Sequence, residues 1–156
     1  MKKLIIVIVV LAVLIGGYLI YHFYWGSGAK KISTEQSADG FKISSGNQSL
    51  EAQYISDPLN YNFGIGVYPS ASASSEQKPA IYSEDSQKLT VGTFKTADSI
   101  DQVVDYYKEQ FGSGAIAGKY IYQGVTYNVV KSSNNEGPIV NIFSEDNQTT
   151  LMIVKK

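Results

Sequence analysis

Residues 4–25 read LIIVIVVLAVLIGGYLIYHFYW, and this stretch decides how the rest of the chain is interpreted. Its 22 residues include no Asp, Glu, Lys or Arg. About 20 apolar residues in a helix span the hydrocarbon core of a bilayer, because each adds about 1.5 Å to a core about 30 Å thick. A helix also satisfies its own backbone hydrogen bonds in lipid. We therefore predict a transmembrane helix over residues 4–25.

The order of residues within this segment is typical of a membrane anchor. Aliphatic side chains fill its first half, two glycines sit mid-span, and aromatic rings gather at its end, where they suit the headgroup region. The two glycines are adjacent and lack the Gly-x-x-x-Gly spacing of helix-packing motifs. The residues that we assign to the anchor are Leu4, Ile5, Val10, Leu14, Gly16, Gly17, Tyr21, Tyr24 and Trp25.

A cleaved signal peptide is the competing interpretation of the same stretch. Lys2 and Lys3 form a basic n-region, and Ser27-Gly28-Ala29 matches a small-x-small cleavage site before Lys30. The hydrophobic region of a signal peptide usually has about 7–15 residues, which favours an uncleaved anchor here. The chain has no cysteine, so attachment through a lipidated cysteine is excluded.

Basic residues flank both ends of the segment, with Lys2 and Lys3 before it and Lys30 and Lys31 after it. The charge bias is therefore small, and we expect the arrangement usual for export signals, with the short basic N-terminus in the cytoplasm. This predicts a single-pass protein of the plasma membrane. We divide it into a membrane anchor (1–25), a juxtamembrane linker (26–40) and an extracytoplasmic domain (41–156).

Composition limits what the domain after the anchor does. From Lys30 onward there are 11 Lys, no Arg and 14 acidic residues, so the domain is mildly acidic. No basic patch with interleaved aromatic residues is present, which excludes nucleic acid as an expected partner. About 115 residues suffice to bury a core in one domain without disulfides.

The pattern beyond residue 40 predicts an α+β domain, an antiparallel sheet with one packed amphipathic helix. A hairpin is expected to turn at Gly46-Asn47, and a low-complexity loop is expected over residues 69–79. Ser99–Phe111 has the spacing of a helix, with a capping box formed by Ser99 and Gln102. Further strands are expected at 81–82, 88–96, 119–123, 125–132, 139–143 and 149–154, the last apolar on both faces and therefore central.

Two segments share five of seven residues: Ile81–Gln87 (IYSEDSQ) and Ile142–Gln148 (IFSEDNQ). A duplicated domain would explain the identity, but the flanking residues do not match and no sustained period is present. We interpret the two segments as hairpins that use similar turn chemistry.

A set of short motifs runs along the second half of the chain: Tyr68-Pro69-Ser70-Ala71, Gly92–Thr96, Asp98-Ser99-Ile100, Val103 and Tyr106-Tyr107. With them the chain resembles a small extracytoplasmic α+β domain of bacterial and archaeal membrane-anchored envelope proteins. That domain has Tyr-Pro-Gly-Ala, where this chain has Ser70 in place of glycine, then Thr-x-Asp-Ser opening a helix with a Val and an aromatic pair, then closing strands. The resemblance implies a fold and an extracytoplasmic location for residues 63–156, and no catalytic residues.

No catalytic, cofactor-binding or metal-binding residues are assigned. The domain has no His, Cys or Arg, and the single histidine, His22, lies in the apolar segment. This excludes Ser-His-Asp and Cys-His nucleophiles and His/Cys zinc sites. Two carboxylate pairs, Glu84-Asp85 and Glu145-Asp146, have the chemistry of a glycosidase or calcium site, but acidic residues are ordinary in hairpin turns. We therefore expect no enzyme and no cofactor.

The chain has 12 tyrosines, and four of them form our candidate interaction surface: Tyr106, Tyr120, Tyr122 and Tyr127. Filling the core between helix and sheet is the competing role for these rings. The function that we expect is a non-catalytic interaction or accessory subunit of the cell envelope or of a membrane complex, with membrane lipid and another membrane or envelope protein as partners. The alternatives are a ligand-binding module with a Tyr-lined site and, with less support, a carboxylate-based hydrolase.

Overall fold

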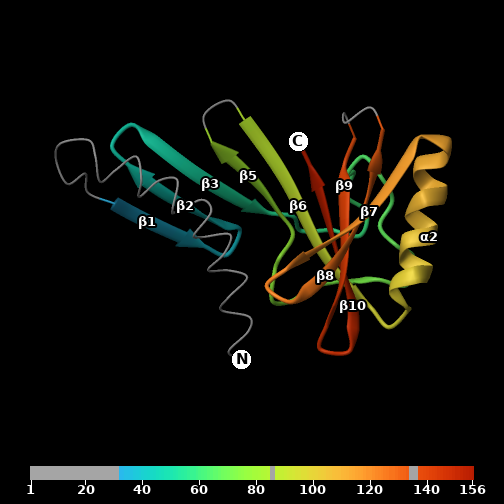
Figure 1. The fold of residues 1–156 in the computed structure, drawn as a ribbon. Coiled ribbons are helices and arrows are strands. Elements are labelled where there is room, and N and C mark those ends of the chain that lie inside the picture. The colour runs from blue at the N-terminus through green and yellow to red at the C-terminus, as the bar shows by residue number, and fades with distance from the viewer. Residues whose placement is uncertain (1–31, 85–86, 134–136) are drawn as a thin grey trace.

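The computed structural model describes residues 32–84, 87–133 and 137–156, which form one antiparallel sheet of ten strands with one α-helix (Figure 1). The predicted α+β class is confirmed. The elements are β1 (Ile32–Ser37), β2 (Gly40–Ser45), β3 (Gln48–Tyr54), β4 (Ser72–Ala73), β5 (Ala80–Glu84), β6 (Gln87–Thr96), α2 (Ile100–Phe111), β7 (Ala115–Tyr122), β8 (Val125–Ser132), β9 (Ile139–Glu145) and β10 (Gln148–Lys155).

The sheet consists of two meanders joined through their last strands. Its order is β1-β2-β3-β5-β6-β10-β9-β8-β7, and the short β4 also pairs with β6. The junction is the antiparallel β6–β10 pair, in which Phe94 lies opposite Leu151. The strand predicted to be central, β10, lies between β6 and β9 as expected, and Leu151 and Ile153 are fully buried. Among the described strands, β1 and β7 lie at the two edges of the sheet.

Three predicted hairpins are present at the expected turns. Ser45 lies opposite Gln48 in β2–β3, and Gly46 between them has φ 61°, a backbone conformation that glycine adopts at little cost. The related segments that begin at Ile81 and Ile142 both close hairpins, β5–β6 and β9–β10. Residues 85–86 of the first turn lie outside the described residues. The two segments occupy corresponding places in their hairpins, since Glu84 lies opposite Gln87 and Glu145 lies opposite Gln148, and the hairpins lie next to each other through the β6–β10 pair.

Helix α2 has the predicted ends. The Ser99 side chain accepts a hydrogen bond from the Gln102 backbone N–H (3.4 Å), and the Gln102 side chain accepts one from the Ser99 backbone N–H (3.0 Å), which completes the capping box. The helix ends at Gly112, which has φ 65° and leads into a 3₁₀ turn, Gly112–Gly114. Val103 and Tyr107 of the predicted apolar stripe are fully buried against the sheet.

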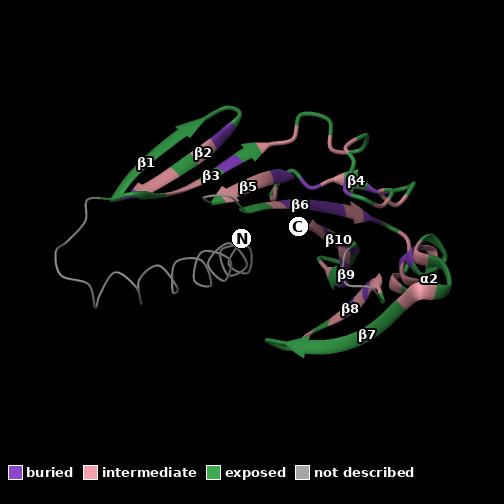
Figure 2. Cartoon of the chain, turned by 90° about the horizontal axis from the view of Figure 1, so that it is seen from above, coloured by how far each residue is buried: buried purple, intermediate pink, exposed green. Residues whose placement is uncertain are grey.

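The core lies between α2 and one face of the sheet, which we call the helix face. Phe63, from an irregular segment, is fully buried in it and packs edge to face on Phe94 (centroids 5.7 Å apart). The opposite face, which we call the open face, has no described helix over it, and Figure 2 shows the sheet curving around this side. The buried core residues are Phe63, Ala71, Phe94, Val103, Tyr107, Val130, Val140, Ile142, Leu151 and Ile153.

Two irregular segments differ in detail from what the sequence predicts. Residues 32–37, assigned to the juxtamembrane linker, form strand β1, so the described sheet includes residues before 41. All six side chains of β1 are exposed, so the strand has no apolar alternation from which it could be recognised. The loop predicted for residues 69–79 is present apart from the two-residue strand β4, but its residues Ala71 and Ser74 are buried.

The predicted membrane helix over residues 4–25 lies outside the described residues, as do residues 26–31 of the predicted linker. Within the described ranges, α2 is too short and too polar to cross a bilayer, and no other helix there has the length or apolarity required.

Candidate functional site

The four candidate tyrosines do not form one surface. Tyr120 of β7 and Tyr127 of β8 are cross-strand partners on the open face, with rings stacked 5.0 Å apart at 8°. Tyr127 also contacts Phe143 of β9 (4.8 Å). Tyr122 follows two residues after Tyr120 and therefore lies on the same face. The sheet thus brings three of the four tyrosines together.

Tyr106 lies on α2, on the other side of the sheet. Its ring makes edge contacts with Tyr68 and Tyr107, each at 5.1 Å. The Tyr107 hydroxyl accepts a hydrogen bond from the Tyr68 backbone N–H (3.1 Å), so this cluster fixes the loop to the helix. Tyr106 has the core-filling role that was the competing interpretation for these tyrosines.

The stacked pair is better suited to packing than to holding a flat ligand. The stack covers one ring face of Tyr120 and one of Tyr127, whose ring also contacts Phe143, and burial raises the pKa of both hydroxyls. A sugar or aromatic ligand requires an uncovered ring face. The Tyr120 hydroxyl donates a long hydrogen bond to Asn141 Oδ1 (3.5 Å), which further fixes its orientation.

The most distinctive surface of the domain is the edge strand β7. Six large hydrophobic residues are highly exposed in the described part of the chain, and four of them belong to this strand. We call them the β7 surface: Ile116 (46% exposed), Tyr120 (46%), Ile121 (74%) and Tyr122 (45%). In Figure 2, β7 is exposed along nearly its whole length, at the end of the sheet. A long apolar edge strand is a template for pairing with another chain.

The sequence reasoning found Tyr120 and Tyr122 but missed Ile116 and Ile121. The strand was expected to begin at Lys119, whereas it begins at Ala115. Its sequence, AIAGKYIY, is apolar on both faces, which is the signal that correctly placed β10 in the centre of the sheet. Sequence alone does not distinguish a covered strand of this kind from an exposed one, because that difference depends on strand order.

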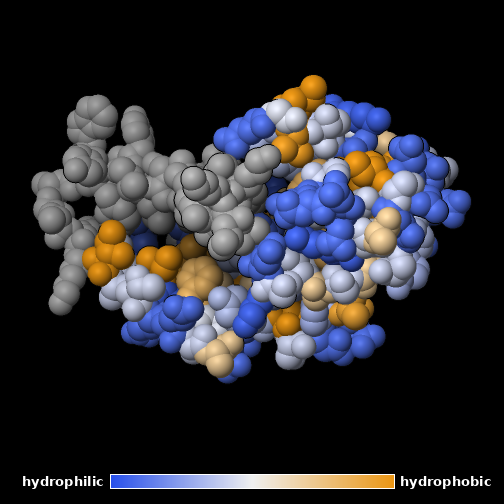
Figure 3. Space-filling view, turned by 90° about the horizontal axis from the view of Figure 1, so that it is seen from below, coloured by the Kyte–Doolittle hydropathy of each residue, from blue (hydrophilic) through white to orange (hydrophobic). Residues whose placement is uncertain are grey.

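The opposite edge of the sheet has a different character. Apart from Ile32, which is 66% exposed, β1 consists of polar residues. Figure 3 shows hydrophobic side chains at the left end of the view, where Figure 1 places β1 and β2. On β2 the ring of Phe41 packs against Tyr82 of β5 (6.4 Å), so part of this apolar group belongs to packing within the sheet.

An open cleft of about 670 Å³ lies between the start of α2 and the β7–β8 hairpin. Several of its polar groups already have partners. Ser99 caps the helix, the Thr149 hydroxyl donates to the Asp98 carbonyl (2.6 Å), and Asn128 Nδ2 donates to the Ile142 carbonyl (3.3 Å). The lining of this cleft contains no tyrosine, so it is not the Tyr-lined site that the ligand-binding alternative requires.

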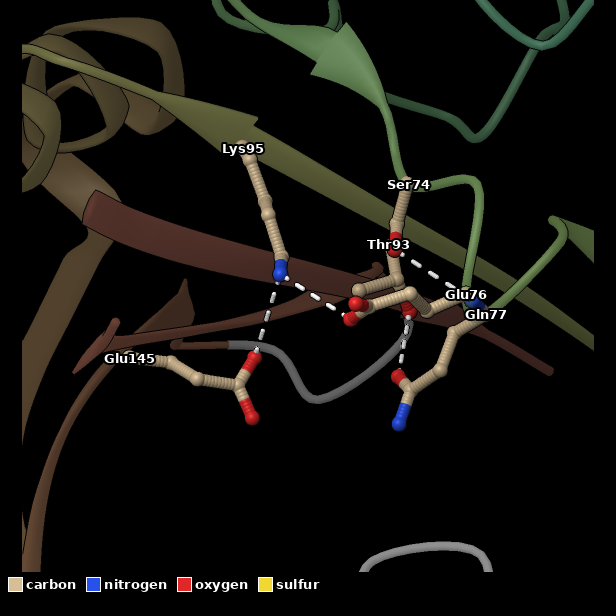
Figure 4. A network of polar contacts seen from close by, with 6 residues as sticks. All are labelled: Ser74, Glu76, Gln77, Thr93, Lys95 and Glu145. Atoms are coloured by element: carbon tan, nitrogen blue, oxygen red, sulfur yellow. Dashed lines mark hydrogen bonds and ion pairs between the residues drawn. The ribbon is translucent and has the colours of Figure 1, made fainter. Parts of the chain in front are cut away.

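The carboxylates on the open face have a structural role. Lys95 of β6 forms ion pairs with Glu76 (3.2 Å) and Glu145 (3.6 Å), as Figure 4 shows. Burial alone would lower the pKa of Lys95, but the hydrogen bond to Glu76 and the nearby negative charges raise it. Beside this network Thr93 donates to the Gln77 side chain (3.2 Å). These contacts hold the segment after β4 against the sheet.

Of the two predicted carboxylate pairs, the structure describes both residues only for Glu145-Asp146. Glu145 is engaged with Lys95, and Asp146 lies in the β9–β10 turn with φ 51°. Glu84 ends β5, and Asp85 lies outside the described residues. In the described ranges there is no group of three or more His, Cys, Asp or Glu side chains with the arrangement of a metal site.

The motifs that carry the family resemblance meet at one place in the fold. The Ser70 hydroxyl donates to Asp98 Oδ2 (2.5 Å) and forms a hydrogen bond with the Thr96 hydroxyl (3.0 Å). Hydrogen bonds from Ser70 and then Tyr68 lower the pKa of Asp98. The Tyr-Pro-Ser-Ala segment is therefore tied to the start of α2, which indicates a structural role for both motifs.

Comparisons with protein-family models, with curated proteins and with solved structures found no match to this chain.

Proposed function

We propose that the protein is a single-pass, membrane-anchored interaction subunit without catalytic activity, with its α+β domain outside the plasma membrane. The β7 surface is the observation that carries this proposal. Exposed hydrophobic side chains normally occur singly on a monomer, whereas a row of them on one edge strand is typical of a protein-binding site. The expected partner is another membrane or envelope protein.

The uncharged segment Leu4–Trp25 supports the membrane location, because its length matches the hydrocarbon core. The relationship to extracytoplasmic envelope domains is part of the same proposal. It is supported by the hydrogen bonds that join Tyr68 and Ser70 to Asp98, since these residues belong to the motifs of the resemblance.

The two alternatives have weaker support. A ligand site lined by tyrosines would need several free ring faces, and the stack of Tyr120 on Tyr127 covers one face of each ring. A carboxylate hydrolase would need two carboxyl groups about 5–9.5 Å apart in a cleft, with one of them free to act as an acid. Glu145 forms an ion pair with Lys95 (3.6 Å).

Purification of the tagged full chain from native membranes in mild detergent tests the proposal. We expect one partner, either another protein or a co-expressed copy of this chain with a different tag, to co-purify in stoichiometric amount with the wild type and to be lost from the Ile121→Lys variant. Leu59→Lys is the matched control, since Leu59 is also exposed (50%) but lies in a loop away from β7. A partner that both variants retain, or a wild-type chain that purifies alone as a monomer, would contradict the proposal.

A further inference from the structure

The direction of the backbone groups on the free edge of β7 follows from one hydrogen bond. The Ser133 N–H donates to the Gly114 carbonyl (2.7 Å), and the register of β7–β8 places these two residues opposite each other. In an antiparallel pair, residues whose N–H and C=O point to the neighbour alternate with residues whose groups point away. The outward-pointing groups of β7 therefore belong to Ala115, Ala117, Lys119 and Ile121. The Ala115 N–H already donates to the Gly112 carbonyl, so only the carbonyl of Ala115 is available to a neighbouring strand.

We infer that the occupant of this edge is β7 of a second copy of this chain, paired antiparallel across a two-fold axis at Gly118. The inference rests on the proposed function, because it names the partner of the same β7 surface. A two-fold axis perpendicular to the sheet keeps each face on its own side, so the two sheets become one continuous sheet. Side chains stay on their own face only if each odd-numbered residue of one β7 lies opposite an odd-numbered residue of the other. The even-numbered residues then also lie opposite each other.

The Gly118 register is the most favourable of those allowed. It pairs Ala115 with Ile121 of the second copy and Ala117 with Lys119 of the second copy. With their symmetry mates these make four pairs of outward-pointing residues, and the two pairs that include Ala115 can each form one hydrogen bond, because the Ala115 N–H is already bonded. On the open face, Ile116 of each copy lies opposite Tyr120 of the other, an aliphatic–aromatic pair of the kind that stabilises sheets. Centring the axis on Lys119 allows as many backbone hydrogen bonds, so the choice between these two registers rests on the side-chain pairs and on charge.

Charge supports the same register. Lys119 is the only charged residue of β7. Centring the axis on Lys119 would place two ammonium groups directly opposite each other, which is destabilising. In the Gly118 register each lysine lies opposite Ala117 instead. The other free edge, β1, is mainly polar and carries the acidic Glu35, so it lacks the apolar self-complementarity of β7.

Cysteine cross-linking of the full chain in native membranes tests this inference. The chain has no cysteine, so each variant carries a single thiol. A Cβ at Gly118 would meet no atom within 4 Å, so Gly118→Cys fits the fold. In the inferred pair the two Gly118 residues are opposite and not hydrogen-bonded, with Cα atoms about 4.5 Å apart, which lies within the range of a disulfide. We expect Gly118→Cys to form a covalent dimer on mild oxidation.

Two sets of control variants test which residues of the two β7 strands lie opposite each other, and which edge of the sheet forms the pair. Ile116→Cys alone should not cross-link, because the two Ile116 residues would lie four positions apart, about 13 Å. Differently tagged Ile116→Cys and Tyr120→Cys chains expressed together should form a mixed disulfide. Glu35→Cys on the other edge should give no dimer.

A chain in which Gly118→Cys forms no dimer, or in which Ile116→Cys dimerises equally well, would overturn the inference. Cross-linking of Gly118→Cys to a different protein would also overturn it, but would leave the proposed interaction function intact. The proposed function fails by a separate result, the retention of its partner by Ile121→Lys in the pull-down.

Discussion

The close packing around Gly92 gives the sharpest prediction about stability. A Cβ at this position would lie 2.6 Å from Phe63 Cζ and 2.7 Å from Phe94 Cε2, and both rings are fully buried. Carbon atoms normally pack at about 3.5–4.0 Å, so Gly92→Ala forces a ring or the strand to move by about 1 Å. Overpacking of this kind costs about 1–3 kcal/mol.

The smaller freedom of alanine in the unfolded chain offsets about 0.4–1 kcal/mol of that cost. We therefore expect a net loss of about 1–2 kcal/mol in the free energy of unfolding. This corresponds to a Tm lower by about 4–8 °C for a domain of this size. Thermal unfolding of the full chain in detergent, followed by the near-UV circular dichroism of its packed tyrosines, measures the change.

Gly118→Ala is the matched control, because the added Cβ meets nothing within 4 Å. It should leave Tm unchanged or slightly higher. Phe63→Leu combined with Gly92→Ala should show coupling, since the smaller side chain removes the clash and the two costs should not add. The reasoning would be refuted by a Gly92→Ala chain as stable as the wild type, or by costs that simply add in the double variant.

Three further predictions concern single polar contacts. Tyr107→Phe removes the acceptor of the Tyr68 N–H and should lower the free energy of unfolding by about 1–3 kcal/mol, measured by urea titration. Lys95→Met removes both ion pairs of that lysine, and the loss should be about 1 kcal/mol or less and should shrink in high salt, since all three side chains are partly exposed. Asp98 has a pKa below its ordinary 3.8, so it contributes stability at neutral pH that is lost as pH falls through that lowered value. Asp98→Asn should flatten the pH dependence of Tm in that acidic window, and an unchanged dependence would exclude Asp98 as its source.

Local patterns in the sequence were sufficient to predict the elements that local chemistry controls. The helix over 99–111 was identified from its apolar spacing and its ends from the Ser99–Gln102 capping box, and both are present. The turn at Gly46-Asn47 was found because few residues other than glycine adopt its positive φ cheaply. The central place of β10 followed from apolar residues on both of its faces.

Features that depend on long-range contacts were not predicted. Phe63 lies in an irregular segment, and only the approach of Gly92 and Phe94 makes it a core residue. Strand β1 has no buried side chain, so its pairing with β2 is visible only in the structure. Tyr120 and Tyr122 of the β7 surface were predicted as interaction residues from the sequence. The position of β7 at the edge of the sheet depends on strand order, which the sequence does not show.

Hydrogen–deuterium exchange of the β7 amides tests the central claim, that this edge binds another chain, most directly. The full-length protein would be purified from native membranes in mild detergent and compared with its Ile121→Lys variant, amide by amide. In the wild type we predict slow exchange at the outward-pointing amides of Ala117, Lys119 and Ile121. In the variant we predict fast exchange at Ala117 and Lys119, the two of these residues that the substitution leaves unchanged. Equally fast exchange of these amides in both proteins would contradict it.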